Sequence, residues 1–249
     1  MANYIIGRNT IFQSLRSGKK IHQIIVNRNL KQDKKIMEIV EEARISNVPL
    51  MYVDSKELDR KSSGEVHQGI LAFVPAYRYA EIDDILNYAK ERNEMPFILM
   101  LDEIEDPHNF GSLIRTSVAA GVHGIIIPQR KQVDVTSTVM KVSTGTADNI
   151  RIVKSSNLVQ TVDKLKDQGL WVIGTHQHAS EDFTKQDYNF PLVLVIGNEG
   201  KGINRLLRQK CDYLVHIPIA TSVIDSLNAS VAGAIIIFKI LERRQCSEK

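Results

Sequence analysis

Apolar and polar residues follow one rhythm in the first third of the chain and another after Phe97. In the first part, short apolar runs predict strands, and apolar residues three and four positions apart predict helices. The strands are expected at 21–26, 49–53 and 69–74, and the helices at 31–46 and 55–61. The pattern therefore predicts a small α/β domain, followed by a connector with one amphipathic helix.

From Phe97 onward, continuous apolar runs alternate with helical segments, which is typical of a parallel sheet covered on both faces. Strands are expected at 97–101, 124–127, 150–153, 170–174, 192–196 and 213–217, and helices at 109–120, 135–142, 157–167, 204–209 and 226–243. A length of 249 residues fits two domains. We predict a first domain at 1–75, a linker at 76–96 and a second domain at 97–249.

The composition is that of an ordinary globular protein, with 43% hydrophobic and 24% charged residues. The longest apolar run is too short to cross a bilayer, so no membrane partner is expected. The N-terminus lacks the residue order of a secretory signal, and the only cysteines are Cys211 and Cys246. These features predict a cytoplasmic protein without a disulfide scaffold.

Positive charge is concentrated in the first domain. Residues 1–75 hold 12 Lys and Arg against 8 Asp and Glu, whereas the remaining residues hold 20 against 21. A basic domain beside a near-neutral one can steer a polyanion toward a site in the second domain. A solvated basic surface with no ligand is the alternative.

Ligands of open α/β sheets lie beyond the carboxyl ends of the strands, and three loops there are unusual. In the first loop, Asn109 is expected to cap a helix that carries Arg115 about two turns later. In the alternative interpretation, Asn109 is only a helix cap and Arg115 is only a solvated surface residue. The spacing alone leaves the two interpretations open.

The second loop, 197–203, has three glycines in six residues and includes Glu199. Glycine lets the backbone approach a ligand closely. The loop fits neither a P-loop nor the dinucleotide fingerprint, so a standard phosphate cradle is not expected. A turn that needs glycine only for its geometry is the alternative. The third loop, 217–230, leads into the last helix, for which Ser226 is the expected N-cap.

In this order and spacing, the three loops resemble the three motifs of the SpoU family, also called the TrmH family, of RNA 2′-O-ribose methyltransferases in the SPOUT class. The first motif matches at Asn109, Gly111, Arg115, Thr116, Ala119 and Gly121. The second matches at Gly197, Asn198, Glu199, Gly200 and Gly202, and the third at Ile217, Pro218, Ser226, Leu227, Asn228, Ser230 and Ala232. Segments 5–9 and 66–70 are similar to the ends of the substrate-binding domain in the branch that methylates a guanosine of large-subunit ribosomal RNA.

The resemblance implies an α/β fold with two parts: a C-terminal SPOUT domain, in which a parallel sheet carries a deep trefoil knot, and a small ribosomal-protein-like N-terminal α/β domain that binds substrate. It also implies a homodimer, S-adenosylmethionine as methyl donor and RNA, most like 23S ribosomal RNA, as substrate. The implied cofactor-binding residues are Thr175, Gly197, Gly202, Ile217 and Leu227, and the implied catalytic residues are Arg115, Asn109, Glu199, Ser226 and Asn228.

Arg115 would act on the ribose hydroxyl or a neighbouring phosphate, either as a base or by its positive charge. A guanidinium is normally protonated, so the electrostatic role is physically easier. The chain departs from the family in the third motif, where Ile219-Ala220-Thr221 replaces Met-x-Gly and one residue is added. Cofactor affinity is therefore the property that this departure puts in question.

Other functions stay open at this point. They are a tRNA ribose methyltransferase, a non-catalytic RNA-binding or ribosome-assembly factor, and a nicotinamide-dependent enzyme, although the last lacks its fingerprint loop. His176 and His178 lie two residues apart, but no cysteine or acidic cluster accompanies them, so no metal is expected.

Overall fold

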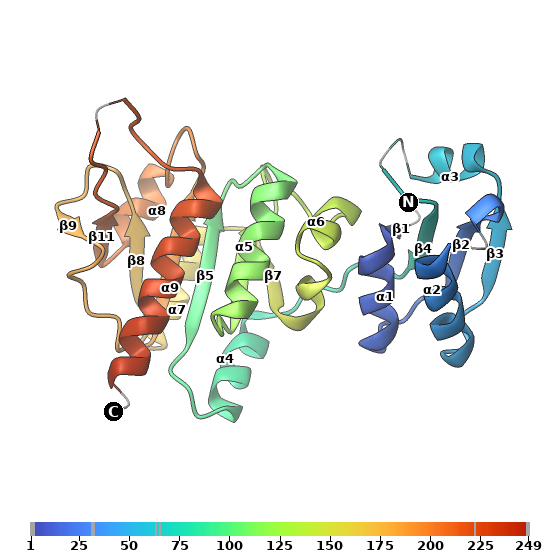
Figure 1. Ribbon diagram of the computed structural model, residues 1–249. Helices are drawn as coiled ribbons and strands as arrows, with labels where there is room; N and C mark the ends of the chain where they lie inside the picture. Colours follow the sequence, from blue (N-terminus) through green and yellow to red (C-terminus); the bar gives the residue numbers. More distant parts are fainter. Residues whose placement is uncertain (1–2, 31–32, 63, 65, 222, 248–249) are drawn as a thin grey trace. The chain divides into compact units, whose positions relative to one another are not determined.

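In a computed structural model, the chain folds into two compact units (Figure 1). The structure describes residues 3–30, 33–62, 64, 66–221 and 223–247. Unit 1 comprises Met1–Arg78 and Asp134–Gly145, and unit 2 comprises Tyr79–Val133 and Thr146–Lys249. The expected boundaries placed 134–145 in the second domain. This segment instead belongs to unit 1, because its helix α6 (Ser137–Val142) contacts strand β1 (Asn3–Ile6).

Unit 1 contains a four-stranded sheet in the order β1-β4-β2-β3. The other strands are β2 (Gln23–Asn27), β3 (Leu50–Val53) and β4 (Ile70–Val74), and the other helices are α1 (Arg8–Arg16), α2 (Lys34–Ile45), α3 (Ser55–Lys61) and the 3-10 turn Arg28–Leu30. Strand β4 pairs antiparallel with both neighbours, whereas β2 and β3 run parallel. Leu58 of α3 is fully buried in a cluster with Ile6, Ile25 and Leu71. The β-branched and leucine side chains of the strands therefore supply this core.

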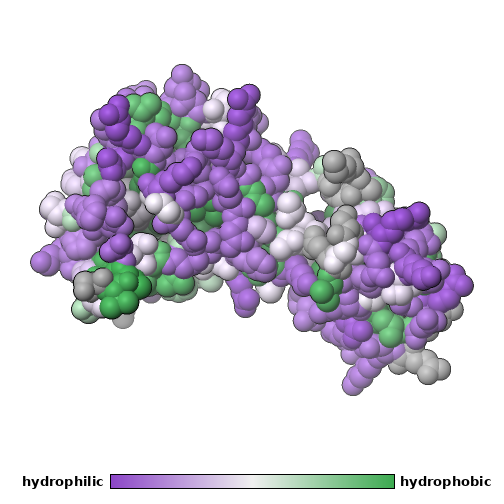
Figure 2. Space-filling view, turned by 90° about the horizontal axis from the view of Figure 1, so that it is seen from above, coloured by the Kyte–Doolittle hydropathy of each residue, from purple (hydrophilic) through white to green (hydrophobic). Residues whose placement is uncertain are grey.

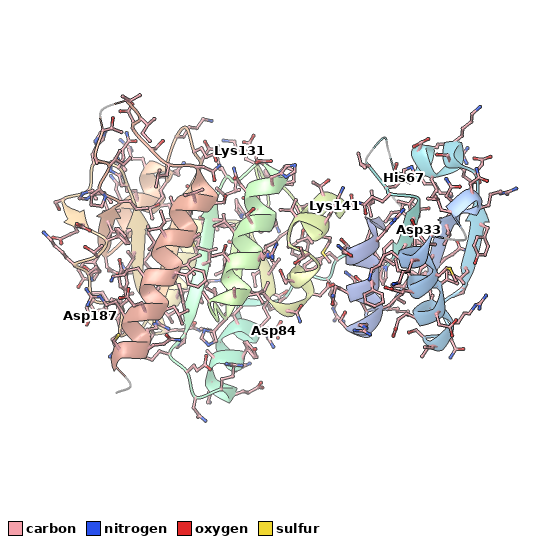
Figure 3. All side chains as sticks on the ribbon, viewed as in Figure 1. Asp33, His67, Asp84, Lys131, Lys141 and Asp187 are labelled. Atoms are coloured by element: carbon pink, nitrogen blue, oxygen red, sulfur yellow. The ribbon has the colours of Figure 1, made fainter. Side chains whose placement is uncertain are left out.

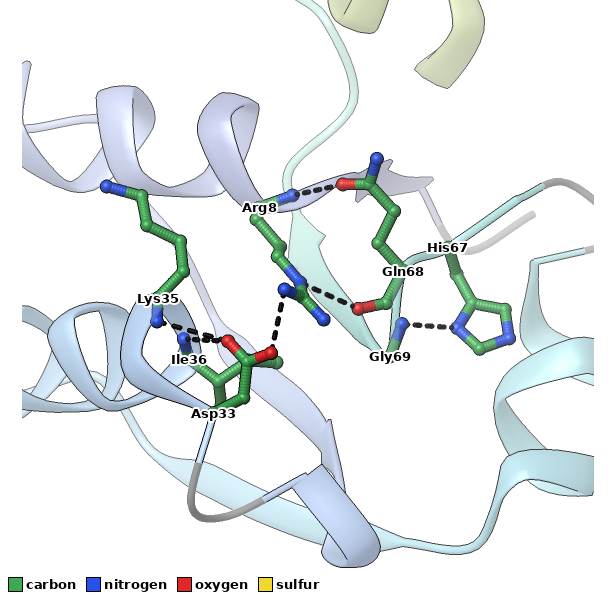
Figure 4. A network of polar contacts seen from close by, with 7 residues as sticks. All are labelled: Arg8, Asp33, Lys35, Ile36, His67, Gln68 and Gly69. Carbon is green, nitrogen blue, oxygen red and sulfur yellow. Dashed lines mark hydrogen bonds and ion pairs between the residues drawn. The ribbon is translucent and has the colours of Figure 1, made fainter.

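A surface network fixes the loops of unit 1 (Figure 4). Arg8 Nη1 pairs with Asp33 Oδ2 at 2.9 Å, and Arg8 Nε donates to the Gln68 carbonyl at 3.0 Å. Asp33 caps α2, because its Oδ1 accepts from the backbone N–H groups of Lys35 and Ile36. These backbone hydrogen bonds, led by that of Ile36, and the Arg8 charge lower the pKa of Asp33.

Unit 2 contains a seven-stranded sheet in the order β7-β6-β5-β10-β8-β11-β9, and every recorded pair is parallel. The strands are β5 (Phe97–Asp102), β6 (Gly124–Pro128), β7 (Arg151–Ser155), β8 (Trp171–Thr175), β9 (Glu181–Asp182), β10 (Leu192–Gly197) and β11 (Tyr213–His216). Every residue of the adjacent strands β5 and β10 is buried, as their continuous apolar sequences predict.

Helices cover this sheet. They are α4 (Ile82–Glu91), α5 (Pro107–Ala119), α7 (Leu158–Asp167), α8 (Arg205–Lys210), α9 (Ala229–Ser247) and the 3-10 turn Thr146–Asn149. Residues of α4, α7 and α8 join one core cluster with the strands. Helices α5 and α9 lie side by side in front of the sheet (Figure 1), where a Cβ on Gly233 would stand 2.5 Å from Leu113 Cδ2. Gly233 therefore permits the close packing of α9 on α5.

Three expectations differ from the structure. The amphipathic helix expected in the connector is present as α4, but it belongs to unit 2 and not to a linker, because its Ile85 is fully buried in the core of that unit. Helix α5 begins at Pro107 and is capped by Asp106, so Asn109 lies inside its first turn. Helix α9 begins at Ala229, and Asn228 Oδ1 rather than Ser226 accepts from the first backbone N–H groups, those of Ser230 and Val231. For α5, an Asp directly before a proline at N1 is the stronger helix start.

Candidate functional site at the carboxyl edge of the parallel sheet

The loops that follow the strands of unit 2 leave from one edge of the sheet, because all its strands are parallel. Lys131, labelled in Figure 3, lies in the loop that follows β6, and its Nζ pairs with Glu103 Oε1 at 3.2 Å. Glu103 itself follows β5, the strand next to β6. Strands β5 and β10 are also neighbours, so the first and second loops meet directly.

The carboxylate of Glu199 joins all three predicted loops. Its Oε1 accepts hydrogen bonds from Asn109 Nδ2 at 2.8 Å, from the backbone N–H of Ala229 at 3.2 Å and from Asn228 Nδ2. Asn228 Nδ2 also donates to Asn109 Oδ1 at 3.0 Å. Hydrogen bonds to an ionised carboxylate are stronger than neutral ones. Glu199 therefore fixes the position of two amide side chains that come from α5 and from the start of α9.

Asn198 shapes the glycine-rich loop that presents Glu199. Its side-chain Nδ2 donates to the Glu103 carbonyl at 2.9 Å, and its Oδ1 accepts from the Gly200 backbone N–H at 2.9 Å. The backbones of Asn198 and Gly202 exchange two hydrogen bonds, which close the loop. A Cβ on Gly197 would stand 2.2 Å from the Gly202 carbonyl carbon, and Gly202 has φ +66°. Both glycines are therefore required by the backbone geometry itself.

A pocket opens beside this loop, between the ends of β8, β10 and β11 and the start of α9. All five residues predicted to bind the cofactor line it, namely Thr175, Gly197, Gly202, Ile217 and Leu227. Glu199 and Ser226 line it as well. Thr175 is oriented by its Oγ1, which donates to the Val195 carbonyl at 3.2 Å. Residues from three separate loops thus meet in one cavity.

The altered third motif also reaches this pocket. Ile219 and Asp225 line it, whereas Ala220 and Thr221 are exposed. The branched side chain of Ile219 therefore supplies apolar wall at a position where the family resemblance leads one to expect methionine.

Within one chain, Arg115 lies apart from the pocket and from the group of Asn109, Glu199 and Asn228. It lies on the exposed side of α5 and is absent from the pocket lining. Within the described ranges, no hydrogen bond or ion pair of its guanidinium is recorded. The structure therefore brings together Asn109, Glu199 and Asn228 as predicted, and leaves Arg115 outside the group.

Several polar pocket residues were not predicted to bind the cofactor. They include Lys201 and Asp225 on the motif loops and His176, Gln177 and His216 at strand ends, of which His176 was considered only as a metal ligand. His176 and Gln177 directly follow β8, and His216 ends β11. Their place at the carboxyl ends of two parallel strands was the available signal.

Asp102 is a buried acid at the end of β5. Its Oδ2 accepts from the Asn204 backbone N–H at 2.6 Å, which ties β5 to the residue that caps α8. Burial raises the pKa of Asp102, and the Asn204 hydrogen bond opposes that rise.

The described residues offer neither a cluster of metal ligands nor a membrane span. No group of three or more His, Cys, Asp or Glu side chains in the described part of the chain is arranged to hold a metal ion. Among these residues, no helix is both long and apolar enough to span a membrane.

Both units match known protein families. Residues 96–238 match the SpoU rRNA Methylase family, and residues 4–80 match the family described as RNA 2′-O ribose methyltransferase substrate binding. YacO of Bacillus subtilis, named for the TrmH family of tRNA/rRNA methyltransferases, is 44% identical over 242 residues, which are 97% of this chain and 96% of that protein. A protein of the same family name from Staphylococcus aureus is 37% identical over 240 residues, 96% of each chain.

Solved structures share the fold. The SpoU methyltransferase AviRb from Streptomyces viridochromogenes aligns with a TM-score of 0.81 at 24% identity, covering 99% of this chain and 91% of that one. Its complex with the cofactor AdoMet aligns with a TM-score of 0.80, also at 24% identity, covering 98% and 90%. These likenesses establish the architecture of both units.

Proposed function

Because the chain belongs to the SpoU rRNA methylase family, it is an S-adenosylmethionine-dependent RNA methyltransferase, and we propose that it methylates the 2′-hydroxyl of a guanosine ribose in 23S-type ribosomal RNA. The observation that carries the proposal is the hydrogen-bonded group of Asn109, Glu199 and Asn228 beside the pocket. Polar groups held at a pocket rim can orient a hydroxyl for transfer.

The pocket suits the cofactor. Ile217 and Leu227 offer apolar side chains and backbone groups to an adenosine, and the glycines at 197 and 202 let the main chain approach it. When bound, S-adenosylmethionine supplies an electrophilic methyl group on a sulfonium. The chain's own residues then have two tasks, which are to align the ribose oxygen with that methyl group and to favour loss of the hydroxyl proton. Alignment alone can contribute about 7–11 kcal/mol.

Each polar residue has a part in this proposal. Asn109, Asn228 and Ser226 orient the RNA by hydrogen bonds, and Glu199 holds the two asparagines. Arg115 lowers the pKa of the ribose hydroxyl by its positive charge, because a guanidinium stays protonated.

A homodimer accounts for the separate position of Arg115. Helix α9 exposes Val231 at 48%, Ile235 at 38% and Phe238 at 48%, and these residues form one apolar stripe at helical spacing. Such a stripe on a helix packed beside α5 fits a second copy of this chain. We place Arg115 of one subunit at the pocket of the other.

Unit 1 would bind the RNA, and the reaction would take place in the cytoplasm. Its family match and the excess of positive charge in residues 1–75 both support this role. Contacts to phosphates and to the shape of a folded RNA need no fixed base sequence.

Ribose methylation in ribosomal and transfer RNA should be mapped in cells that lack the gene and in cells complemented with the wild-type or Arg115→Ala protein. The proposal predicts one guanosine of 23S-type RNA that loses its methyl group and regains it only with the wild-type protein. A missing methyl group in transfer RNA alone would overturn the assignment of substrate. No change in either RNA, together with no binding of S-adenosylmethionine by the purified protein, would favour a non-catalytic RNA-binding factor.

A further inference from the structure

One side of the pocket carries an unusual arrangement of hydrogen-bond donors. Arg208 of α8 places its Nη1 at 2.5 Å from Nε2 of His176, a pocket residue. The other ring nitrogen, Nδ1 of His176, lies 3.3 Å from the backbone N–H of His178. Both nitrogens of one imidazole thus face N–H donors.

A neutral imidazole cannot accept from both. It has one lone-pair nitrogen and one N–H, so one of the two contacts must set a donor against a donor. Protonation would worsen the conflict, since both nitrogens would then be donors. Burial, followed by the charges of Arg208 and His178, lowers the pKa of His176. The lowered pKa favours the neutral imidazole, and in either protonation state the contacts around His176 lack at least one hydrogen-bond acceptor.

His216 adds a second, independent sign. Its Nδ1 is buried and has no hydrogen-bond partner among the described residues, although the residue lines the same pocket. Buried polar atoms without a partner are uncommon in folded proteins. The same pocket thus holds a second histidine, one of whose ring nitrogens has no partner among the described residues.

Charged side chains are distributed unevenly around this pocket. The Arg208 guanidinium contacts His176 at the end of β8 from just outside the lining. Glu199, Asp225 and Lys201 line the part formed by the second and third motif loops, where two acids stand against one lysine. A zwitterionic ligand would therefore place its anionic group near Arg208 and its cationic group near the two acids.

We propose that Arg208 and His176 form the subsite that binds the carboxylate of the cofactor's methionine portion. This inference rests on the proposed function, because it takes the pocket as the S-adenosylmethionine site. The carboxylate is the only anionic group of that molecule, and a carboxylate only accepts hydrogen bonds. It would accept from Arg208 and from the N–H of His176, which removes the conflict between donors. Adenine and ribose, in contrast, present donors as well as acceptors.

Two ligands that differ in the carboxylate test this subsite by calorimetry. S-adenosylhomocysteine carries the amino acid group, and 5′-methylthioadenosine lacks it. The variant Arg208→Gln should bind S-adenosylhomocysteine at least about tenfold more weakly and 5′-methylthioadenosine within about twofold of the wild-type value. Arg205→Gln is the matched control, since Arg205 is an exposed arginine of the same helix and, unlike Arg208, is not the arginine that contacts the pocket residue His176, and it should change neither affinity.

His176→Asn provides a second variant, with thermal unfolding of both variants as the check on folding. It should show the same selective loss, at a smaller factor. Equal weakening of the two ligands, or unchanged binding of S-adenosylhomocysteine to Arg208→Gln, would overturn the subsite while leaving the proposed function intact. If the wild-type protein bound neither ligand, the assignment of the pocket to the cofactor would fail first, and the subsite with it.

Discussion

The two sheets of this protein differ in how they distribute their loops. In unit 2 every recorded strand pair is parallel, so the loops that follow the strands gather at one edge. In unit 1, β4 runs antiparallel to both neighbours, so its loops divide between two ends. Strand direction therefore decides where a site built from several loops can form, and in this protein that place is unit 2.

The polar networks of the two units also differ, in whether the charges they contain are paired. In unit 1, Arg8 and Asp33 neutralise each other at the surface, with side chains 27% and 28% exposed. In unit 2, the Glu199 carboxylate receives only uncharged donors from the residues that the structure describes, and it lies at a pocket wall. The unit 1 network fixes surface loops. The unit 2 network instead holds one negative charge and the side-chain amides of Asn109 and Asn228 together beside the pocket.

The largest effect is expected for Arg115→Ala. Methyl transfer should fall by at least about a thousandfold, because the charge that activates the hydroxyl is lost, while cofactor affinity stays nearly unchanged. Single-turnover transfer and calorimetry measure the two quantities. Full activity of the variant would refute any role for Arg115.

Mixing two inactive variants tests the dimer. Subunits with Arg115→Ala, exchanged with subunits carrying Asn228→Ala, should regain a substantial part of the activity, because one site of each mixed dimer then combines two intact residues. If both residues acted within one chain, no mixed dimer would contain an intact site, and activity would stay lost.

Glu199→Ala should lower the transfer rate by about a hundredfold, because misplacement of reacting groups by about 1 Å has an effect of this size. The substitution leaves Asn109, Asn228 and the Ala229 N–H without their common acceptor. RNA affinity should stay within about twofold. A loss of RNA affinity as large as the loss of transfer rate would mean that unit 2 also dominates RNA binding, which would contradict the division of roles between the two units.

Removal of residues 1–75 is a poor test of unit 1, because α6 would lose its contact with β1. Lys20→Gln and Lys34→Gln, at two exposed positions of unit 1, are cleaner. Each should weaken RNA binding severalfold and reduce the slope of log affinity against log salt by about one, if its lysine contacts a phosphate. Cofactor affinity should not change. Lys164→Gln, on the exposed side of α7 in unit 2, is the control, and an equal effect there would erase the distinction between the units.

The smallest effect concerns the opposite edge of the unit 2 sheet. His123 precedes β6, is 2% exposed and accepts the Phe97 N–H at its Nδ1. Burial lowers the pKa of His123, against the opposing influence of Glu94. The unfolded chain therefore binds more protons than the folded one below about pH 6.5, and stability should fall as the pH drops through this range, by at most about 1.4 kcal/mol per pH unit.

Urea unfolding of wild type and His123→Asn at pH 5 and pH 7.5 measures the change in the free energy of unfolding between the two pH values, which should be smaller in the variant. An equal pH dependence would contradict the assignment to His123.

The sequence predicted the parts of the site that are local and missed those that depend on packing. Continuous apolar runs located β5 and β10, and the glycines of 197–202 marked a loop whose backbone needs two of them, Gly197 and Gly202. The caps of α5 and α9 were misplaced, because several residues that can cap a helix lie within three positions of each other. Strand order and the return of α6 to unit 1 depend on contacts between distant segments, which periodicity does not contain. The deep knot implied by the resemblance stays a prediction.

The position of the transferred methyl group is the most direct test of the account. Purified protein, S-adenosylmethionine and 23S ribosomal RNA from cells that lack the gene should yield 2′-O-methylguanosine on nucleoside analysis by mass spectrometry, with Glu199→Ala as the matched variant of reduced rate. A methyl group on a base, or no transfer at saturating cofactor, would contradict the claim that three converging loops align a methyl donor with a ribose oxygen.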